Sequence, residues 1–232
     1  MEKTAGNSNN LTIRINSDGF SLLINDESGL LLSTQHVSRA LSNLSVEEIV
    51  RIITIETTYY YKKVNIICES DSYIFIPTPF FKREEAMDLL YFQHKKEKNE
   101  RIIYNFVPNW DTVNVFAVPS ALEQALSRLF PESIIEHQLS WLLKNKIIPL
   151  QINSLSIWVR SKILDVIALK NGKLQLMNSF SYQTPEDFTY HVLDIIDKLS
   201  LDIEKCDVFL YNSEKKPELE KMLEKYVTVS SF

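Results

Sequence analysis

The sequence predicts an α/β protein with mixed sheets, built from two lobes in tandem. Its 232 residues exceed one typical domain and fall short of two full ones. Apolar residues make up 45% of the chain and charged residues 24%, which is typical of a protein with a packed core. The deciding observation is that one order of elements, three strands, a helix and a fourth strand, occurs twice.

The first occurrence opens with three strands joined by two turns. Residues 11–15 alternate apolar and polar side chains, which is typical of a half-buried strand, and residues 20–24 return as a second strand. Ser17-Asp18-Gly19 separates them as a hairpin turn, and we expect Gly19 to supply the positive φ of a tight hairpin. A second turn at 25–29 leads to a third strand at 30–36.

A helix and a fourth strand complete this half. Ser45 and Glu48 form a capping box, in which each side chain satisfies a free backbone amide at a helix start. The helix that follows carries a stripe of apolar residues along one face. Residues 64–68 (VNIIC) then read as a buried strand.

The same order returns after residue 150. Strands are expected at 156–160, 163–169 and 174–181, with an Asn-Gly hairpin at 171–172. Thr184 is the expected N-cap of the next helix, with Pro185 at its first position.

Two further elements close the chain. Residues 207–211 (DVFLY) read as the fourth strand of this half. A last helix over 217–226 is expected to bury Leu219, Met222, Leu223 and Tyr226.

The middle of the chain carries additional elements. Pro77 and Pro79 end its first strand, and Pro131 breaks its second helix. The expected elements are strands at 73–77, 101–106, 112–118 and 133–136 and helices at 82–94, from Ser120, and at 137–145.

This order of elements resembles that of a ribonuclease-H-like domain, and two such lobes in tandem resemble the actin-like ATPase superfamily. Residues 73–81 (YIFIPTPFF), 113–119 (VNVFAVP) and 178–188 (NSFSYQTPEDF) are similar to segments of an uncharacterised bacterial family, domain of unknown function 3822. That family has an actin-like fold and no established activity. More distantly, the middle segment resembles the actin-like domains of pilus and type II secretion proteins, which act largely by gripping partners.

The resemblance implies the following domain limits. A disordered N-terminus covers 1–10, and a first ribonuclease-H-like lobe covers 11–149 with an inserted segment at 71–118. The second ribonuclease-H-like lobe covers 150–232. We expect the two lobes to be separated near Pro149.

An ATPase of this superfamily holds phosphates between two turns, each typically with an Asp-x-Gly sequence. Here the first turn is Ser17-Asp18-Gly19, which is also what an ordinary hairpin uses. The second turn, Arg160-Ser161-Lys162, has neither glycine nor acid. The superfamily's nucleoside site corresponds to 212–215, which also lacks glycine. ATP hydrolysis is therefore not expected.

If any ligand binds, these two turns are the candidate cleft residues, with Asp165 as a further candidate. The cations Arg160 and Lys162 could hold an anion or a partner's carboxylate, and both turns could equally be plain solvated hairpins. Asp165 lies within an apolar strand, where an ionised carboxylate is costly unless it is paired. It marks either a site or an acid reached by a Lys or Arg.

Composition argues against several other classes of protein. A net charge of −5 argues against a nucleic-acid partner. Cys68, Cys206 and four scattered histidines form no cluster with metal-ligand spacing, so we expect reduced thiols, no metal site and no cofactor. The polar N-terminus and the lack of a long apolar run predict a cytoplasmic protein with no transmembrane segment.

These observations favour a non-catalytic adaptor or scaffold that binds an unidentified protein or peptide in its cleft or along a sheet edge. No catalytic residues are assigned, and whether the protein is an enzyme stays open, with no enzyme favoured. One alternative is a nucleotide- or phosphometabolite-binding protein with a divergent site, a weak ATPase or kinase. Another is a structural protein that associates with itself.

Overall fold

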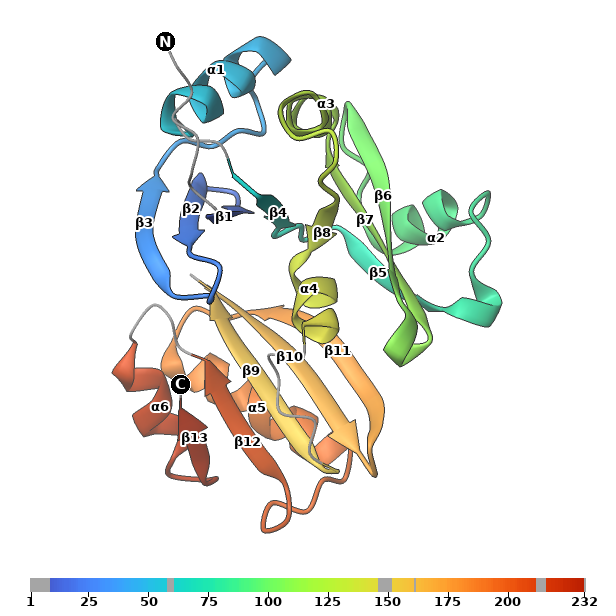
Figure 1. Ribbon diagram of the computed structural model, residues 1–232. Coiled ribbons are helices and arrows are strands. Elements are labelled where there is room, and N and C mark those ends of the chain that lie inside the picture. Colours follow the sequence, from blue (N-terminus) through green and yellow to red (C-terminus); the bar gives the residue numbers. More distant parts are fainter. Residues whose placement is uncertain (1–8, 58–60, 146–151, 161, 212–215, 232) are drawn as a thin grey trace. The chain divides into compact units, whose positions relative to one another are not determined.

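The computed structural model describes residues 9–57, 61–145, 152–160, 162–211 and 216–231. The chain divides into two compact units, residues 1–144 and 145–232. Each contains a five-stranded mixed sheet, and the two sheets are separate (Figure 1). None of the described helices has the length and apolar character needed to span a membrane.

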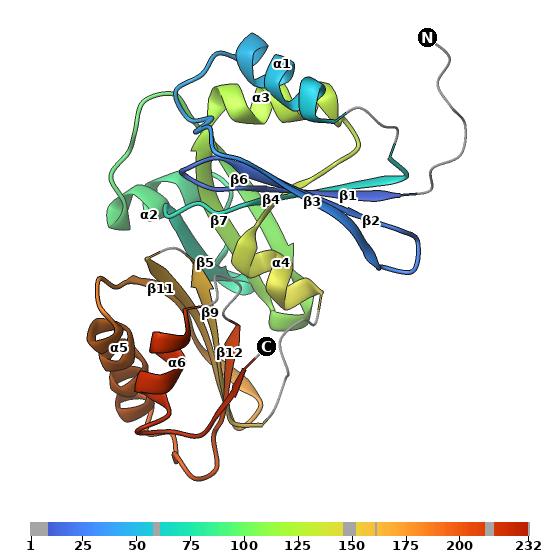
Figure 2. The same ribbon diagram turned by 90° about the vertical axis from the view of Figure 1, so that its left-hand side faces the viewer.

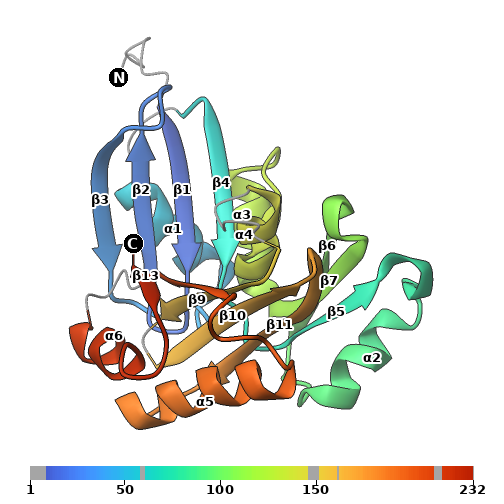
Figure 3. The ribbon, with the colours of Figure 1, turned by 90° about the horizontal axis from the view of Figure 1, so that it is seen from below.

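The first unit begins with the three-stranded meander that the sequence predicts. Strands β1 (Asn10–Ile15), β2 (Phe20–Asn25) and β3 (Leu31–Val37) pair antiparallel. β4 (Lys63–Cys68) then lies parallel to β1, and β8 (Ile135–His137) lies parallel to β4. The order β3-β2-β1-β4-β8 is visible for its first four strands in Figure 3.

Two helices cover one face of this sheet. α1 (Val46–Glu56) and α3 (Ser120–Leu129) lie side by side there (Figure 2). The Ser45–Glu48 capping box is present as predicted. Because side chains alternate along β1, its apolar residues are buried while Thr12 and Arg14 point to the other face.

Between β4 and β8 the chain builds a sheet of its own. β5 (Tyr73–Pro77), β7 (Thr112–Pro119) and β6 (Glu100–Val107) pair antiparallel in that order. α2 (Ala86–Gln93) packs on one face, and α4 (Gln138–Lys144) packs against β6. The short 3-10 helices η1 (Thr78–Phe80) and η2 (Pro108–Trp110) follow β5 and β6. The predicted helix over 82–94 starts too early, because Lys82 and Glu85 close a turn before it.

The second unit repeats the topology of the first. β9 (Ser154–Arg160), β10 (Ile163–Lys170) and β11 (Lys173–Ser181) form the antiparallel part. β12 (Asp207–Tyr211) is parallel to β9, and β13 (Val229–Ser231) is parallel to β12. The sheet order is therefore β11-β10-β9-β12-β13, the counterpart of the first sheet.

Helices α5 (Pro185–Lys198) and α6 (Pro217–Leu223) lie on one face of this second sheet, where they share a single apolar core with it (Figure 2). Thr184 caps α5 as predicted, and Asp187 completes a capping box. The last helix is shorter than expected: it ends at Leu223, Met222 is only half-buried, and Tyr226 is 54% exposed. The chain after it forms β13 instead.

Candidate functional site

The candidate site of the first unit lies at the carboxyl ends of its parallel strands. Ile15 of β1, Cys68 of β4 and His137 of β8 stand at one level of the sheet, since their backbones are paired. Open α/β sheets bind ligands at the carboxyl ends of such strands. The turn between β1 and β2 leaves the sheet at this edge.

The backbone amides of this turn are already satisfied. The side-chain oxygen of Asn16 accepts hydrogen bonds from the amides of Asp18 at 3.1 Å and Gly19 at 2.8 Å. The Asn16 amide donates to the Gly19 carbonyl at 3.0 Å, which closes the turn. Ser17 donates to the Asp18 carboxylate at 3.2 Å, and both residues are exposed. A phosphate would have to displace Asn16 to reach these amides.

Gly19 serves a different purpose from the one expected. Its φ is not positive, in contrast to Gly29 and Gly172. A Cβ at position 19 would lie 2.0 Å from the Val37 carbonyl oxygen and 2.9 Å from the Arg39 amide nitrogen. The prediction of a positive φ at Gly19 is therefore wrong, and the glycine is required because another backbone segment passes against it.

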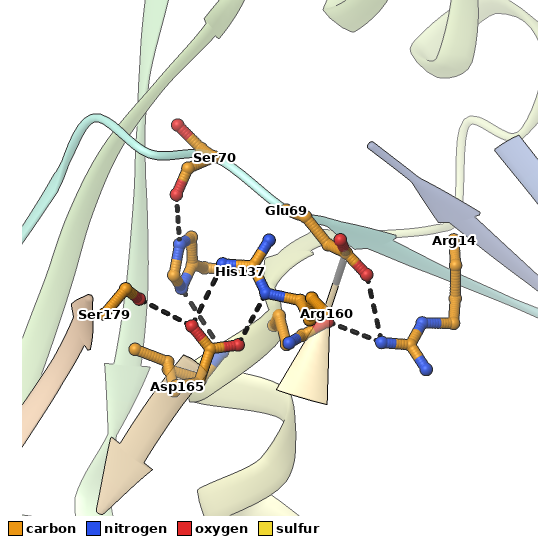
Figure 4. A network of polar contacts seen from close by, with 9 residues as sticks. Arg14, Glu69, Ser70, His137, Arg160, Asp165 and Ser179 are labelled. Carbon is orange, nitrogen blue, oxygen red and sulfur yellow. Dashed lines mark hydrogen bonds and ion pairs between the residues drawn. The ribbon is translucent and has the colours of Figure 1, made fainter. Parts of the chain in front are cut away.

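An ion pair lies beside this turn, on the sheet face opposite α1 and α3 (Figure 2). Arg14 donates to Glu69, which directly follows β4, at 3.0 Å (Figure 4). The same guanidinium donates to the side-chain oxygen of the buried Gln138 at 2.5 Å. An acid at the end of β4 could hold a metal ion, but here a cation is its close neighbour.

His137 is a structural residue of this edge. Its amide donates to Asn105 at 2.7 Å, and its Nε2 lies 2.9 Å from the Ser70 carbonyl oxygen (Figure 4). The Leu139 amide donates to Nδ1 at 3.3 Å, so a neutral ring with its proton on Nε2 satisfies both contacts. Its ring centroid is also 4.4 Å from that of Tyr73. These contacts fix the imidazole in one orientation.

The second unit holds a buried pair on its own sheet. Arg160 donates twice to the Asp165 carboxylate, from Nε at 2.7 Å and from a terminal nitrogen at 2.9 Å (Figure 4). Ser179 donates to the same carboxylate at 2.5 Å. Asp165 is 2% exposed and stands directly opposite Ser179 across the β10–β11 pairing. Asp165 is therefore an acid reached by an Arg, and its part in a binding site stays a prediction.

The other predicted residues of the second turn lie as follows. Lys162 is exposed, and its carbonyl accepts a hydrogen bond from the Tyr182 amide at 2.9 Å. Ser161 and the segment 212–215 lie outside the described residues. In each unit the structure therefore brings its own candidates together, the turn 17–19 in one and Arg160 with Asp165 in the other.

Both units thus place an arginine against a carboxylate of the same unit. Within the described ranges, no group of three or more His, Cys, Asp or Glu side chains could hold a metal ion. Cys68 and Cys206 are buried and are not joined in a disulfide. The arrangement is suited to holding the sheet ends in a defined shape.

The sequence reasoning missed Asn16, Arg14, Glu69 and Gln138. Asn16 carried a usable signal, because Asn two residues before a turn amide commonly accepts its hydrogen bond. The other three come from β1, the end of β4 and the start of α4. Only the paired register of those strands brings them together.

Comparison with solved structures identifies the fold. A protein with actin-like ATPase fold and unknown function from Bacteroides thetaiotaomicron VPI-5482 is 26% identical, with a TM-score of 0.80 over 100% of this chain and 93% of that chain. A chain of the PilM–PilN type IV pilus biogenesis complex is 11% identical, with a TM-score of 0.55 over 98% and 89%. The ethanolamine utilization protein EutJ from Carboxydothermus hydrogenoformans is 7% identical, with a TM-score of 0.49 over 95% and 83%.

The match to the protein from Bacteroides thetaiotaomicron confirms the predicted fold class. The protein is a mixed α/β protein with an actin-like ATPase fold. No curated protein matches its sequence. The family described as "Protein of unknown function (DUF3822)" matches residues 1–229, so the chain belongs to that family.

Proposed function

We propose that this protein is a catalytically inactive member of the actin-like fold that works as an adaptor or scaffold by binding a protein partner. The observation that carries the proposal is the Asn16 side chain, which occupies the amides of Asp18 and Gly19. In an actin-like ATPase those amides have to be available for phosphate.

The charges at the sheet ends support the same conclusion. A divalent ion that bridges phosphates needs carboxylates with free lone pairs and a negative local charge. Glu69 is paired with Arg14, and Asp165 is paired with Arg160 at both of its oxygens. Each ion pair has a net charge close to zero and therefore attracts a magnesium ion only weakly.

Proteins of this architecture can act through partners. PilM, which shares the fold at a TM-score of 0.55, forms a type IV pilus biogenesis complex with PilN. By analogy alone, that arrangement makes protein binding a reasonable role for the present chain.

The α2 region offers a surface for such a partner. Phe92 on α2 is 88% exposed, and Phe80 just before the helix is 73% exposed. Met87 on α2 and Phe106 on β6 are also exposed. Aromatic side chains are enriched in protein–protein interfaces. Exposed apolar surface of this kind does not contribute to the stability of an isolated monomer.

The alternative function, a binder of nucleotides or phosphometabolites, has one observation in its favour. The hydroxyls of Ser154 and Ser156 on β9 are buried and make no hydrogen bond within the described residues. The same strand ends at Arg160, and the exposed Lys162 follows two residues later. Hydroxyls and cations of this kind suit an anion.

A thermal-shift experiment separates the two functions. We expect ATP, ADP and magnesium, alone or together, to leave the melting temperature unchanged. A ligand at a hundred times its dissociation constant would stabilise the fold by about 2.7 kcal/mol, which is readily measured. A saturable shift with Mg-ATP would overturn the proposal, and loss of that shift in Lys162→Glu would favour the alternative.

Partner capture from the native host tests the adaptor role directly. We expect Phe92→Ser to reduce recovery of a specific partner without changing the melting temperature. Tyr190→Ser is the matched control, since Tyr190 is an exposed aromatic residue of α5, 64% exposed. Equal recovery of the partner with both variants would mean that α2 is not the binding surface. The turns at 17–19 and 160–162 would then be tested with Lys162→Glu.

A further inference from the structure

The edge strand β3 differs from an ordinary protected edge. Its sequence, LLSTQHV, contains no proline and no acidic or basic residue other than one histidine. Leu31 and Leu32 are 51% and 52% exposed, and Leu30 just before the strand is 64% exposed. Within the described residues β3 pairs with β2 and with no other strand. One row of its backbone donors and acceptors is therefore open.

The other sheet edges carry the usual protection against pairing. β8 and β13 have three residues each, and β5 ends at Pro77. β6 begins with Glu100 and Arg101, and β11 begins with Lys173. Short length, proline and charge are the devices by which natural sheets avoid edge-to-edge contact. β3 has only a bulge at its first residues, next to Leu32, and is regular from Ser33 to Val37.

We propose that β3 pairs with β3 of a second copy of this chain, so that the two sheets join into one across a two-fold axis. An open strand edge binds another strand through its backbone, and side chains select which one. The pairing is antiparallel, as a two-fold axis perpendicular to the sheet requires, and Thr34, the middle residue of β3, lies on the axis.

This register matches most of β3 with itself. Leu31 faces Val37 of the second copy and Ser33 faces Gln35 of the second copy, so these pairs join apolar with apolar and polar with polar side chains. Leu32, at the bulge, faces His36 and forms a mixed pair. Thr34 faces its own counterpart, a pair that forms well across strands. No charged residue of β3 meets a like charge.

The residues that flank β3 are complementary too. The turn before the strand contains the acid Asp26 and also Glu27, which is paired with Lys62 at 2.7 Å, and Arg39 follows β3. Antiparallel pairing brings the acidic turn of one copy toward Arg39 of the other. Arg39 is exposed and makes no ion pair within the described ranges, although its charge acts on Glu48 of the same chain. The positions of these charges therefore favour antiparallel pairing of the two β3 strands over parallel pairing.

The test is the oligomeric state of charge variants at the axis. Sedimentation equilibrium is expected to give wild-type dimers that dissociate on dilution. Thr34→Lys places two ammonium groups together and is expected to weaken dimerisation about tenfold or more. Thr34→Glu has the same effect, and an equimolar mixture of the two variants restores the dimer. Gln175→Lys on β11 is the control with an equal charge change at an exposed edge position, and it leaves the dimer unchanged.

Hydrogen exchange locates the contact independently of any variant. Amides of β3 are expected to exchange slowly at high concentration and rapidly after dilution, while those of β11 do not change. A wild-type chain that stays monomeric overturns the inference, as does a dimer that Thr34→Lys leaves intact. Protection of β3 only on adding a different protein also overturns it, and points to a foreign strand. The inference is independent of the adaptor proposal, because α2 and β3 are tested by different variants.

Discussion

Position 19 has to be glycine because another segment of backbone lies close against it. The segment from Val37 to Arg39 runs so near that no side chain fits, although the φ of the glycine is one that any residue can adopt. The contact links the β1–β2 turn to the end of β3. A larger side chain at position 19 would therefore displace the backbone that follows β3 and would not strain the φ angle of residue 19.

Gly19→Ala is therefore expected to lower the free energy of unfolding by about 1–3 kcal/mol or more, because the added methyl group forces backbone apart. Gly172→Ala is the control. Its φ of +70° makes alanine strained, but nothing lies within 4 Å of its Cβ, so it costs about 1 kcal/mol. Urea denaturation measures both. A smaller loss for position 19 than for position 172 would contradict the account.

Asp165 is expected to matter more than a surface acid. Asp165→Ala leaves the guanidinium of Arg160 buried without its carboxylate and is expected to cost about 3–5 kcal/mol. Asp194→Ala is the control, since it removes an ion pair to the exposed Lys198 and is expected to have a much smaller effect. Chemical denaturation of the three proteins checks this, and equal losses would show that the pair is not a buried one.

Burial raises the pKa of the Cys206 thiol from 9.0 to about 11, and the Asp207 carboxylate acts in the same direction. The unfolded thiol therefore loses its proton at a lower pH than the folded one. Its contribution to stability is complete below pH 9.0 and is lost as the pH rises toward about 11.

The measurement is alkylation by iodoacetamide, which attacks the thiolate. At about pH 8 we expect slow labelling of Cys206 in the folded chain and rapid labelling in urea, followed by mass spectrometry of the peptide. Labelling at the same rate in both states would contradict the raised pKa.

The residue contacts differ in how far they could be predicted. The register of the β9–β10 hairpin places Asp165 within reach of Arg160, so the expectation of an arginine partner followed from local pairing. Arg14, Glu69 and Gln138 come from three strand ends whose adjacency depends on the order of the whole sheet. Nothing near any one of them in the sequence indicates the other two.

The capped starts of two helices are the features of the fold that the sequence predicts best. The caps at Ser45 and Thr184 were predictable because a capping box depends on four consecutive residues only. The start of α2 and the end of α6 were predicted less well. Residues Lys82–Glu85 close a turn before α2, and Tyr226 lies in the turn that follows α6, where its amide donates to the Leu223 carbonyl at 3.0 Å.

Ser45→Ala is expected to destabilise the protein by about 0.5–2 kcal/mol, since the amide of Glu48 loses its acceptor at the start of α1. Ser42→Ala changes an exposed residue of the preceding turn and serves as the control. Thermal denaturation compares them. Identical melting temperatures would mean that packing against α3 alone holds the first turn of α1.

The two units share one topology. Each sheet places its first strand in the centre, between an antiparallel neighbour and a parallel one. Periodicity and turn signals were sufficient to predict the order of strands and helices along the chain in both halves, and the resemblance to a ribonuclease-H-like domain supplied the arrangement of the sheet. Neither could reveal that each half also neutralises a carboxylate at the sheet end, which requires the packed structure.

Magnesium alone is therefore expected to leave the protein unaffected. Millimolar Mg²⁺ should not raise the melting temperature beyond the effect of potassium chloride at equal ionic strength, because the carboxylates of Glu69 and Asp165 are paired with arginines. Differential scanning fluorimetry makes the comparison. A saturable rise that Arg14→Gln strengthens would show that the first pair competes with a metal ion.

The position of β4 has a consequence for synthesis of the chain. β1, β2 and β3 can pair as soon as they leave the ribosome, and β4 can then add to β1. The outer edge of β4 is closed only by β8, which emerges after β5, β6 and β7. Those three strands have an apolar core of their own with α2 and can fold in the interval. The unpaired edge of β4 is thus where a nascent chain has most need of a chaperone.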